Sequence, residues 1–196
     1  MEASLVGSEM CIRDSFFSHP ELIRELALSY NDYEHSEDPK IDAGWKGWRT
    51  PAPKAINEGI YDVMKKAYKI EEKDYVCTPY FHIAYEETKL TCDFPNFKWH
   101  VDQSDYAGLV YLHPEPPKKT GTCLINGTEN EIITVDNVFN RIVAYPSYYY
   151  HAPEDLFGTM KDKESGRMTL TFFLWSNENP FKRQAIQWMR HKEVEN

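Results

Sequence analysis

The sequence lacks the features that mark membrane-spanning and cysteine-stabilised proteins. No uninterrupted apolar run approaches the roughly 20 residues that a helix needs to span a bilayer. Its cysteines, Cys11, Cys77, Cys92 and Cys123, show no Cys-x-x-Cys spacing. A zinc ribbon is therefore not expected, and a chain of this length can bury a core without a disulfide scaffold. We expect reduced thiols in a cytoplasmic protein that has no membrane partner.

The chain also has little basic charge. It carries 22 lysines and arginines against 31 acidic residues, which gives a formal net charge of −9 and argues against a nucleic-acid partner. A disordered or collagen-like chain is excluded because 41% of the residues are hydrophobic and 14% are aromatic. No internal repeat or low-complexity tract is present. At 196 residues, the chain is most simply a single domain.

Residues 1–15 stand apart from the rest of the sequence. They lack the basic start and the continuous apolar stretch of a secretory signal peptide. The segment from Ser4 to Ser15 resembles a translated sequencing-adapter string that recurs in environmental metagenome assemblies. We therefore expect a non-native leader that contributes nothing to the fold or to a functional site. The single domain is expected to cover residues 16–196.

The first part of this domain, residues 16–74, is predicted to be helical support. Pro20–Tyr30 has the pattern of a helix with Ser18 as its N-cap. Four residues form its expected buried stripe: Leu22, Ile23, Leu26 and Ala27. A second helix is predicted over Lys54–Tyr68, and a closing helix is predicted over Asn179–His191.

From Tyr75 onward the pattern changes to short aromatic and β-branched runs separated by turn residues. Strands are predicted over Tyr75–Tyr85, Phe97–Val101, Gly108–His113, Thr122–Asn126, Arg141–Tyr145, Tyr148–His151 and Met168–Trp175. Because no helix separates them, these strands predict an antiparallel sandwich or jelly roll over residues 75–176. The fold class is thus mainly β with flanking helices, and residues 177–196 follow as a C-terminal helical segment.

His100 and Asp102 are the most informative candidates for a metal site. Side chains alternate along a strand, so these two residues project from the same side of Phe97–Asp102. Two other His-x-acid matches fit less well. His35-Ser36-Glu37 lies in a polar loop, and proline interrupts His113-Pro114-Glu115. The pattern alone is weak, and a surface ion pair between His100 and Asp102 is the alternative explanation.

Two later residues strengthen the metal hypothesis. His151 ends a predicted strand, and two imidazoles with one carboxylate can cover adjacent corners of an octahedral iron(II). Arg167 shares a strand face with Thr169, and a guanidinium inside a barrel requires an anion because an unpaired buried charge is costly. Arg167 could hold the far carboxylate of an acidic co-substrate in a two-point grip. Taken alone, His151 could be a packed core residue and Arg167 an exposed one.

This ordered set resembles the Fe(II)/2-oxoglutarate-dependent dioxygenases, whose core is a double-stranded β-helix of the jelly-roll or cupin-like type. The resemblance covers roughly Tyr75–Trp175, and Gly121–Ile125 resembles the family's Gly-x-x-Leu strand. It implies that Fe(II) is held by the ligands His100, Asp102 and His151, which would be the catalytic residues. A looser likeness, in the N-terminal helix and the Trp-Arg-Thr-Pro loop, points to a bacterial and phage group within this superfamily.

The resemblance also implies a small-molecule co-substrate. The keto-acid end of 2-oxoglutarate would chelate the iron, and its other carboxylate would meet Arg167, helped by Thr169. Tyr85 or Tyr111 would add a hydrogen bond to 2-oxoglutarate. With O2, the implied reaction hydroxylates a C–H bond of an unidentified substrate and releases succinate and CO2. The presence of Asp102 argues against the halogenating subgroup, which lacks this carboxylate.

Some positions carry less defined expectations. Arg167 follows His151 after a longer gap than many members show, and Gly158–Ser165 is polar enough to be an inserted surface hairpin. The segments Trp45–Arg49 and Glu86–Asn96 are candidate covers for the substrate. Several aromatic residues could line the pocket, although core packing is the commoner role of such residues: Tyr80, Tyr85, Tyr111, Tyr149 and Trp175.

Two other functions remain compatible with these residues. The first is a cupin-like metal enzyme that does not use 2-oxoglutarate, although such enzymes usually cluster more histidines near the first ligand. The second is a non-catalytic jelly-roll binding module in which the same residues only pack. The affinity for Fe(II) and for 2-oxoglutarate would separate all three functions.

Overall fold

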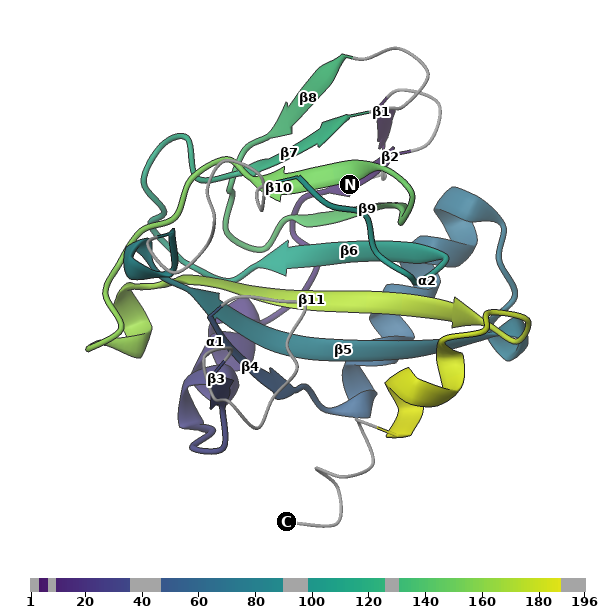
Figure 1. Cartoon of the computed structure of the whole chain (residues 1–196), viewed down its shortest axis with the longest axis horizontal. Helices are drawn as coiled ribbons and strands as arrows, with labels where there is room; N and C mark the ends of the chain where they lie inside the picture. The colour runs from purple at the N-terminus through teal and green to yellow at the C-terminus, as the bar shows by residue number, and fades with distance from the viewer. Residues whose placement is uncertain (1–3, 7–9, 36–46, 90–98, 126–130, 188–196) are drawn as a thin grey trace.

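The computed structural model describes residues 4–6, 10–35, 47–89, 99–125 and 131–187, with the backbone alone described for residues 4–6 and 89. Two antiparallel sheets form its body (Figure 1). The larger sheet has the order β1 (Ser4–Val6), β2 (Met10–Arg13), β9 (Ile142–Pro146), β6 (Tyr106–Tyr111), β11 (Arg167–Ser176), β5 (Tyr75–Ala84), β4 (Trp48–Pro51) and β3 (Glu34–His35). The smaller sheet has the order β10 (Tyr150–Pro153), β7 (Thr122–Ile125) and β8 (Ile132–Val135).

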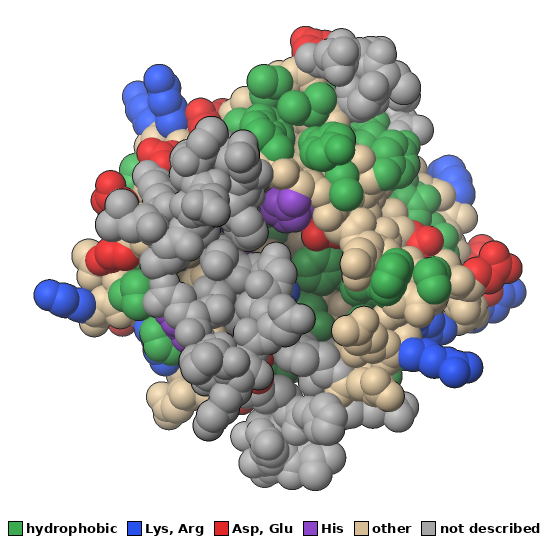
Figure 2. All heavy atoms as spheres, in the orientation of Figure 1, with side chains coloured by type: hydrophobic (Ala, Val, Ile, Leu, Met, Phe, Trp, Pro, Cys, Tyr) green, Lys and Arg blue, Asp and Glu red, His purple; other side chains and the backbone are tan. Residues whose placement is uncertain are grey.

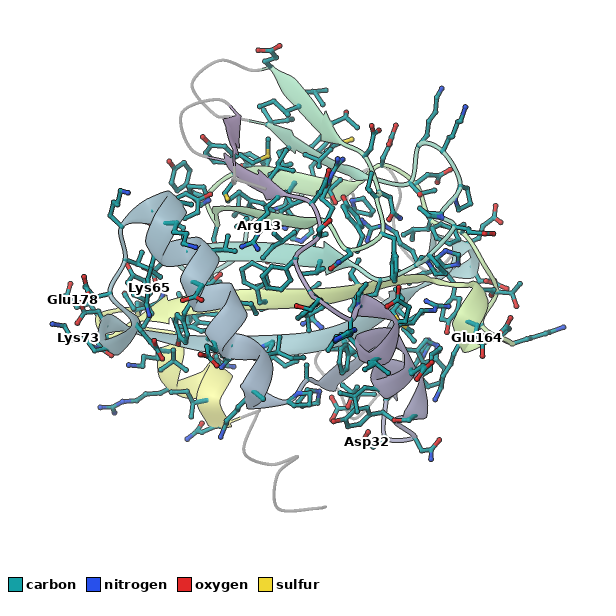
Figure 3. All side chains as sticks on the ribbon, turned by 180° about the vertical axis from the view of Figure 1, so that it is seen from behind. Arg13, Asp32, Lys65, Lys73, Glu164 and Glu178 are labelled. Atoms are coloured by element: carbon teal, nitrogen blue, oxygen red, sulfur yellow. The ribbon has the colours of Figure 1, made fainter. Side chains whose placement is uncertain are left out.

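Two helices cover one face of the larger sheet. They are α1 (Pro20–Ser29) and α2 (Asn57–Tyr68), and Figure 3 shows both lying across this face. Short 3-10 turns complete the described elements: Lys54–Ile56, Glu72–Asp74, Glu86–Lys89 and Lys163–Ser165. Residues 182–187 are helical as well. Within the described part of the chain, no helix has the length and apolar character that crossing a membrane requires.

The longest strands separate a helix-covered core from a space between the sheets. Along β11, Met168, Leu170, Phe172 and Leu174 are 0% exposed and pack with residues of the helices. The intervening residues, from Arg167 to Phe173, project toward the smaller sheet because side chains alternate across a strand. Leu109, Tyr111 and Tyr145 pack on that second face. The predicted jelly-roll core with helical support is therefore confirmed.

The first helix exists as predicted, but its details differ. The N-cap position is His19 and not Ser18, and it makes no side-chain capping hydrogen bond. Leu22 is 59% exposed and Leu26 is 37% exposed, whereas Ala27 is fully buried. The helix is oriented so that Arg24 donates to the backbone oxygens of Leu112 (3.0 Å) and Glu164 (2.8 Å), which turns the predicted leucines toward solvent.

Several strand boundaries also differ from the prediction. Residues 97 and 98 lie outside the described residues, and His100 forms only an isolated bridge with His151. The strand β8 was missed because it is short and partly exposed, and β4 was predicted to be a loop. The predicted closing helix is described only as far as residue 187.

The segment before residue 16 is not a structureless leader. Cys11 of β2 pairs with Ala144 of β9, which places β2 within the larger sheet. Met10 and Cys11 are each 1% exposed, and Asp14 forms an ion pair with Arg141 at 2.6 Å. The expectation that residues 1–15 contribute nothing to the fold is wrong, because Met10 and Cys11 belong to the buried core.

Candidate metal centre

The structure brings His100, Asp102 and His151 together. One ligand atom from each residue lies within 4.8 Å of the others, and among the described residues this is the one cluster of metal-ligating type. The distance from His151 Nε2 to Asp102 Oδ2 is 3.2 Å, and that from His100 Nε2 to Asp102 Oδ1 is 4.0 Å. Two imidazoles and one carboxylate on one side of a site form the arrangement expected for a three-ligand metal centre with open positions.

Backbone hydrogen bonds hold the three ligands in place. His100 N donates to His151 O at 3.1 Å, and His151 N donates to His100 O at 2.9 Å. This bridge fastens the segment before β6 to strand β10. Asp102 N donates to Ser147 O at 3.1 Å, which ties the carboxylate ligand to the turn after β9. The ligands thus come from two chain segments joined edge to edge.

The local electrostatics suit a metal ion. His151 Nδ1 lies 3.0 Å from the carbonyl oxygen of Tyr149, so Nδ1–H donates and the Nε2 lone pair faces Asp102. Burial acts to lower the pKa of His151, but the hydrogen bond and charge of Asp102 raise it above its usual value. Burial acts to raise the pKa of Asp102, but His151, His100 and Arg49 hold it below its usual range.

The centre is open on one side. The His100 side chain is 43% exposed, whereas those of Asp102 and His151 are 18% and 9% exposed. Figure 2 shows a histidine and an acidic side chain at the rim of a hollow in the middle of this face, with hydrophobic side chains inside it. A small molecule can therefore approach the three ligands from the solvent side.

Arg167 projects into the space between the sheets, as the strand pattern predicted, and is 5% exposed. Its Nε donates to Thr120 O at 2.9 Å, and its Nη2 donates to Gly121 O and to Thr122 Oγ1, each at 3.1 Å. No carboxylate of the described residues pairs with Arg167. Burial lowers the pKa of its guanidinium, yet the buried charge lacks a compensating anion.

These contacts correct one expectation about Arg167. Two of its three nitrogens are already committed to backbone oxygens, so only Nη1 remains for a ligand and a two-point grip by this residue alone is not available. Thr169, on the same strand face, is fully buried, and its Oγ1 has no hydrogen-bond partner in the part of the chain that the structure describes. An anion placed here would meet one guanidinium nitrogen and one unpaired hydroxyl.

The tyrosines are distributed differently from the prediction. Tyr85 lies in the helix-covered core and not between the sheets. The reason is strand alternation: Ala84 pairs with Arg167, so the residue after it faces the opposite side. Tyr111 does lie beside Arg167, with its ring centroid 5.4 Å from Cζ. However, its hydroxyl is already bonded to Thr122 Oγ1 at 2.7 Å.

Tyr145 was missed by the sequence reasoning. Its ring centroid lies 4.9 Å from that of His151, and the residue is 3% exposed. Burial raises the pKa of its hydroxyl well above the usual value; Asp102 adds to that increase and Arg167 opposes it. Tyr145 therefore lies beside a metal ligand, and the charges of Asp102 and Arg167 both act on its hydroxyl. Its position at the end of a predicted strand was the only sequence signal, and many aromatic residues share that property.

The remaining candidate residues lie outside the metal cluster and make packing contacts. His113 packs edge-on against Phe157, with ring centroids 4.9 Å apart, and His35 packs against Trp48 at 4.6 Å. Neither His-x-Glu match therefore joins the metal cluster. Tyr149 packs with the inter-sheet core, while Tyr80 and Trp175 lie along β5 and β11.

Comparison with known proteins identifies the fold. Neither a protein-family model nor a curated protein matches the chain. A prolyl-4-hydroxylase from Pseudomonas putida matches it with a TM-score of 0.56 and 10% identity, over 86% of this chain and 92% of that one. A 2OG-Fe(II) oxygenase family oxidoreductase from Burkholderia pseudomallei has a TM-score of 0.56 and 9% identity, over 87% and 85% of the two chains. The chain has the fold of the 2OG-Fe(II) oxygenases.

A third solved structure widens the chemistry associated with this oxygenase fold. The non-heme α-ketoglutarate-dependent epimerase SnoN from nogalamycin biosynthesis matches with a TM-score of 0.55 and 9% identity, over 85% of this chain and 77% of that one. The resemblance inferred from the sequence is thus confirmed for the fold. A prolyl-4-hydroxylase and an epimerase have this same fold, so the fold alone does not determine the reaction.

Gly121 has a defined structural role within the oxygenase fold. It directly precedes β7, and a Cβ at this position would lie 2.0 Å from the carbonyl oxygen of Val135. Only glycine fits there, and its own carbonyl oxygen accepts from Arg167. The Gly-x-x-Leu likeness therefore marks the backbone that orients the buried guanidinium.

Proposed function

We propose that this protein is an Fe(II)/2-oxoglutarate-dependent oxygenase that hydroxylates a C–H bond. The observation that carries the proposal is the pairing of a three-ligand metal centre with a buried arginine that has no carboxylate partner among the described residues. When bound, the iron supplies the oxygen-activating chemistry that couples conversion of 2-oxoglutarate to succinate and CO2 with oxidation of the substrate. The protein residues bind, orient and desolvate the reactants.

The metal centre fits Fe(II) by the chemistry of its donors. His100 and His151 offer imidazole nitrogens, and Asp102 offers a carboxylate oxygen, a set that suits divalent iron and leaves coordination positions for other ligands. The Nδ1–H bond of His151 to Tyr149 O fixes the tautomer that presents Nε2 to the metal. The carbonyl oxygen is an obligate acceptor, so this orientation does not depend on the metal.

The arginine fits the distal carboxylate of 2-oxoglutarate. Among the described residues, Arg167 Nη1 is not bonded to a backbone oxygen and Thr169 Oγ1 has no hydrogen-bond partner, so a carboxylate placed beside them could accept from both. We assign the third contact to Tyr145 and not to Tyr85, because Tyr145 packs in the inter-sheet core beside His151, whereas Tyr85 lies in the helix-covered core. Tyr111 supports the guanidinium through its ring and is already hydrogen-bonded.

Binding experiments test the proposal directly. Zn(II) and 2-oxoglutarate are titrated into the protein without O2, so that affinity is measured without turnover. His100→Ala is expected to abolish metal binding, whereas His113→Ala, a histidine outside the cluster, is expected to retain it. Arg167→Met is expected to weaken 2-oxoglutarate binding by roughly 30- to 1000-fold through loss of a charge-assisted contact in a buried site. The exposed Arg183→Met serves as its control.

The outcome of turnover separates the competing functions. Succinate release that depends on Fe(II), together with a substrate that gains one oxygen atom from O2, is the result expected for a hydroxylase. Succinate release with a product that gains no oxygen would favour an epimerase of the SnoN kind. Metal binding without any affinity for 2-oxoglutarate would instead favour a cupin-like enzyme, and the absence of both would leave a binding module.

A further inference from the structure

A row of aromatic side chains lies on the inter-sheet face of β5 and β11. The ring centroids of Tyr80 and Phe173 are 6.0 Å apart, and those of Phe173 and Trp175 are 6.4 Å apart. Phe173 and Trp175 are partly exposed, whereas their neighbours Phe172 and Leu174 on the helix-covered face are 0% exposed. The inner row is therefore not a closed core and offers aromatic surface to a ligand.

The strand register places this row next to the metal centre. Phe173 pairs with Ala107, and Ala107 pairs with Tyr145, whose ring contacts that of His151. The small side chain of Ala107 thus separates Phe173 from the tyrosine beside the metal ligands. Arg167 lies farther along β11, at its first residue.

A second arginine lies against this row of aromatic side chains. Arg49 of β4 has its Cζ 5.1 Å from the ring centroid of Tyr80 and 5.6 Å from that of Phe173. Burial lowers the pKa of Arg49 to about 10, so its guanidinium keeps its positive charge at neutral pH; Tyr80, Asp102 and Glu34 oppose the decrease.

Metal binding changes the charge around Arg49. A divalent ion held by Asp102 would neutralise the carboxylate that now balances part of the Arg49 charge, and a dication near a guanidinium favours an anion close to both. A guanidinium has five N–H donors in a fixed fork, so Arg49 can keep its protein partners and still bind a carboxylate. The aromatic rings beneath it favour an apolar, ring-containing neighbour to that carboxylate.

We propose that Arg49, Tyr80, Phe173 and Trp175 form the subsite for the primary substrate, and that this substrate is an acid whose carboxylate lies beside an apolar ring. The inference rests on the proposed function, since it treats the Arg167 end of the cavity as the 2-oxoglutarate site. It assigns the two arginines to different ligands: Arg167 binds the co-substrate, and Arg49 selects the substrate.

Calorimetric titration with a panel of probes tests this assignment. The protein is first saturated with Zn(II) and 2-oxoglutarate, and benzoate, phenylacetate, 3-phenylpropionate and 4-phenylbutyrate are then titrated, each beside its primary amide. At least one acid is expected to bind at least tenfold more tightly than its amide. Arg49→Gln should reduce the affinity of that acid by tenfold or more, which is about 1.4 kcal/mol, and should leave the amide unaffected. Trp175→Leu should weaken both probes, and the exposed Arg183→Gln should weaken neither.

The assignment is overturned if no acid binds, if acid and amide bind alike, or if Arg49→Gln binds the acid as the unchanged protein does. Competition between the acid and 2-oxoglutarate would also overturn it, because the acid would then occupy the Arg167 end. Failure of the proposed function is distinguishable: in that case 2-oxoglutarate itself would not bind the Zn(II)-loaded protein. If Arg49→Gln lost 2-oxoglutarate affinity, Arg49 would belong to the co-substrate site and the subsite assignment would be wrong.

Discussion

Asp105 is expected to couple the metal-ligand segment to the end of β11, and Asp105→Asn tests this coupling. Its carboxylate accepts hydrogen bonds from Ser176 N at 2.7 Å, Ser176 Oγ at 3.2 Å and Asn179 Nδ2 at 3.0 Å. Its backbone oxygen accepts from Ser147 N at 3.1 Å, and Ser147 O accepts from Asp102 N at 3.1 Å. The chain of contacts therefore runs from the C-terminal end of the strand to a metal ligand.

The magnitude follows from the bonds that change. Asparagine keeps the shape of Asp105 but removes the charge and one acceptor oxygen, so all three bonds lose their charge assistance and at least one loses its acceptor. Each is worth up to about 1.5–3 kcal/mol, against about 1 kcal/mol for a neutral bond, and the site is only partly buried. We expect a loss of about 2 kcal/mol in the free energy of unfolding. For a domain of this size this lowers Tm by roughly 4–8 °C.

The assay combines thermal unfolding with Zn(II) titration. Asp74→Asn, which alters an exposed aspartate, is the matched control and should behave as the unchanged protein. Zn(II) affinity of Asp105→Asn should fall by roughly three- to tenfold, less than for a residue that bonds a metal-ligating side chain directly. If the variant has a lower Tm but binds Zn(II) with unchanged affinity, Asp105 stabilises the fold and does not influence the metal site. A variant that melts and binds like Asp74→Asn would refute the reasoning.

Three further predictions follow from other contacts. Gly121→Ala should lower Tm and weaken 2-oxoglutarate binding, because the added Cβ collides with a backbone oxygen at 2.0 Å and displaces the carbonyl that holds Arg167; unchanged affinity would contradict this. Deletion of residues 1–13 should destabilise the protein by at least about 2 kcal/mol in denaturant titration, since buried apolar side chains of β2 are removed, and an unchanged midpoint would refute that role. Zn(II) affinity should fall between about pH 8 and about pH 5, because Asp102 raises the pKa of His151 and a proton on Nε2 competes with the metal; a constant affinity would exclude His151 as a ligand.

The fold was predictable because its strongest signals are local. Short aromatic and β-branched runs bounded by turns indicated an antiparallel jelly roll, and the helix of Lys54–Tyr68 has an apolar face that the structure buries through Ile60 and Met64. Of the predicted α1 stripe, Ala27 is buried and Ile23 packs against the core, whereas Leu22 and Leu26 are exposed because sequence periodicity does not determine how a helix rotates about its axis. The polar contacts of Arg24 set that rotation, and its acceptors lie 88 and 140 residues away in the chain.

The metal cluster was predictable for a different reason. His100 and Asp102 are two residues apart, the spacing that places both side chains on one side of a strand. A later histidine, His151, and a later arginine, Arg167, follow in the order expected for an oxygenase site. The structure brings His100, Asp102 and His151 together. The position of Tyr145 beside His151 could not be predicted. It depends on how close β9 and β10 lie in space, and the sequence does not give that distance. The strand β2 was missed because a strand of four residues is too short to show alternation.

The contacts of Arg167 explain why this residue lowers the stability of the fold when no ligand is bound. A buried guanidinium with two nitrogens fixed to backbone oxygens is held rigidly, yet its charge has no carboxylate among the described residues. Fixing the donor before binding reduces the entropy lost when the ligand is captured, while the unbalanced charge reduces stability. A ligand that supplies the missing anion restores that stability. At about 100 times its Kd, 2-oxoglutarate would add about 2.7 kcal/mol to the unfolding free energy, and at the same concentration Arg167→Met should gain less than about 1 kcal/mol because it binds 2-oxoglutarate roughly 30- to 1000-fold more weakly.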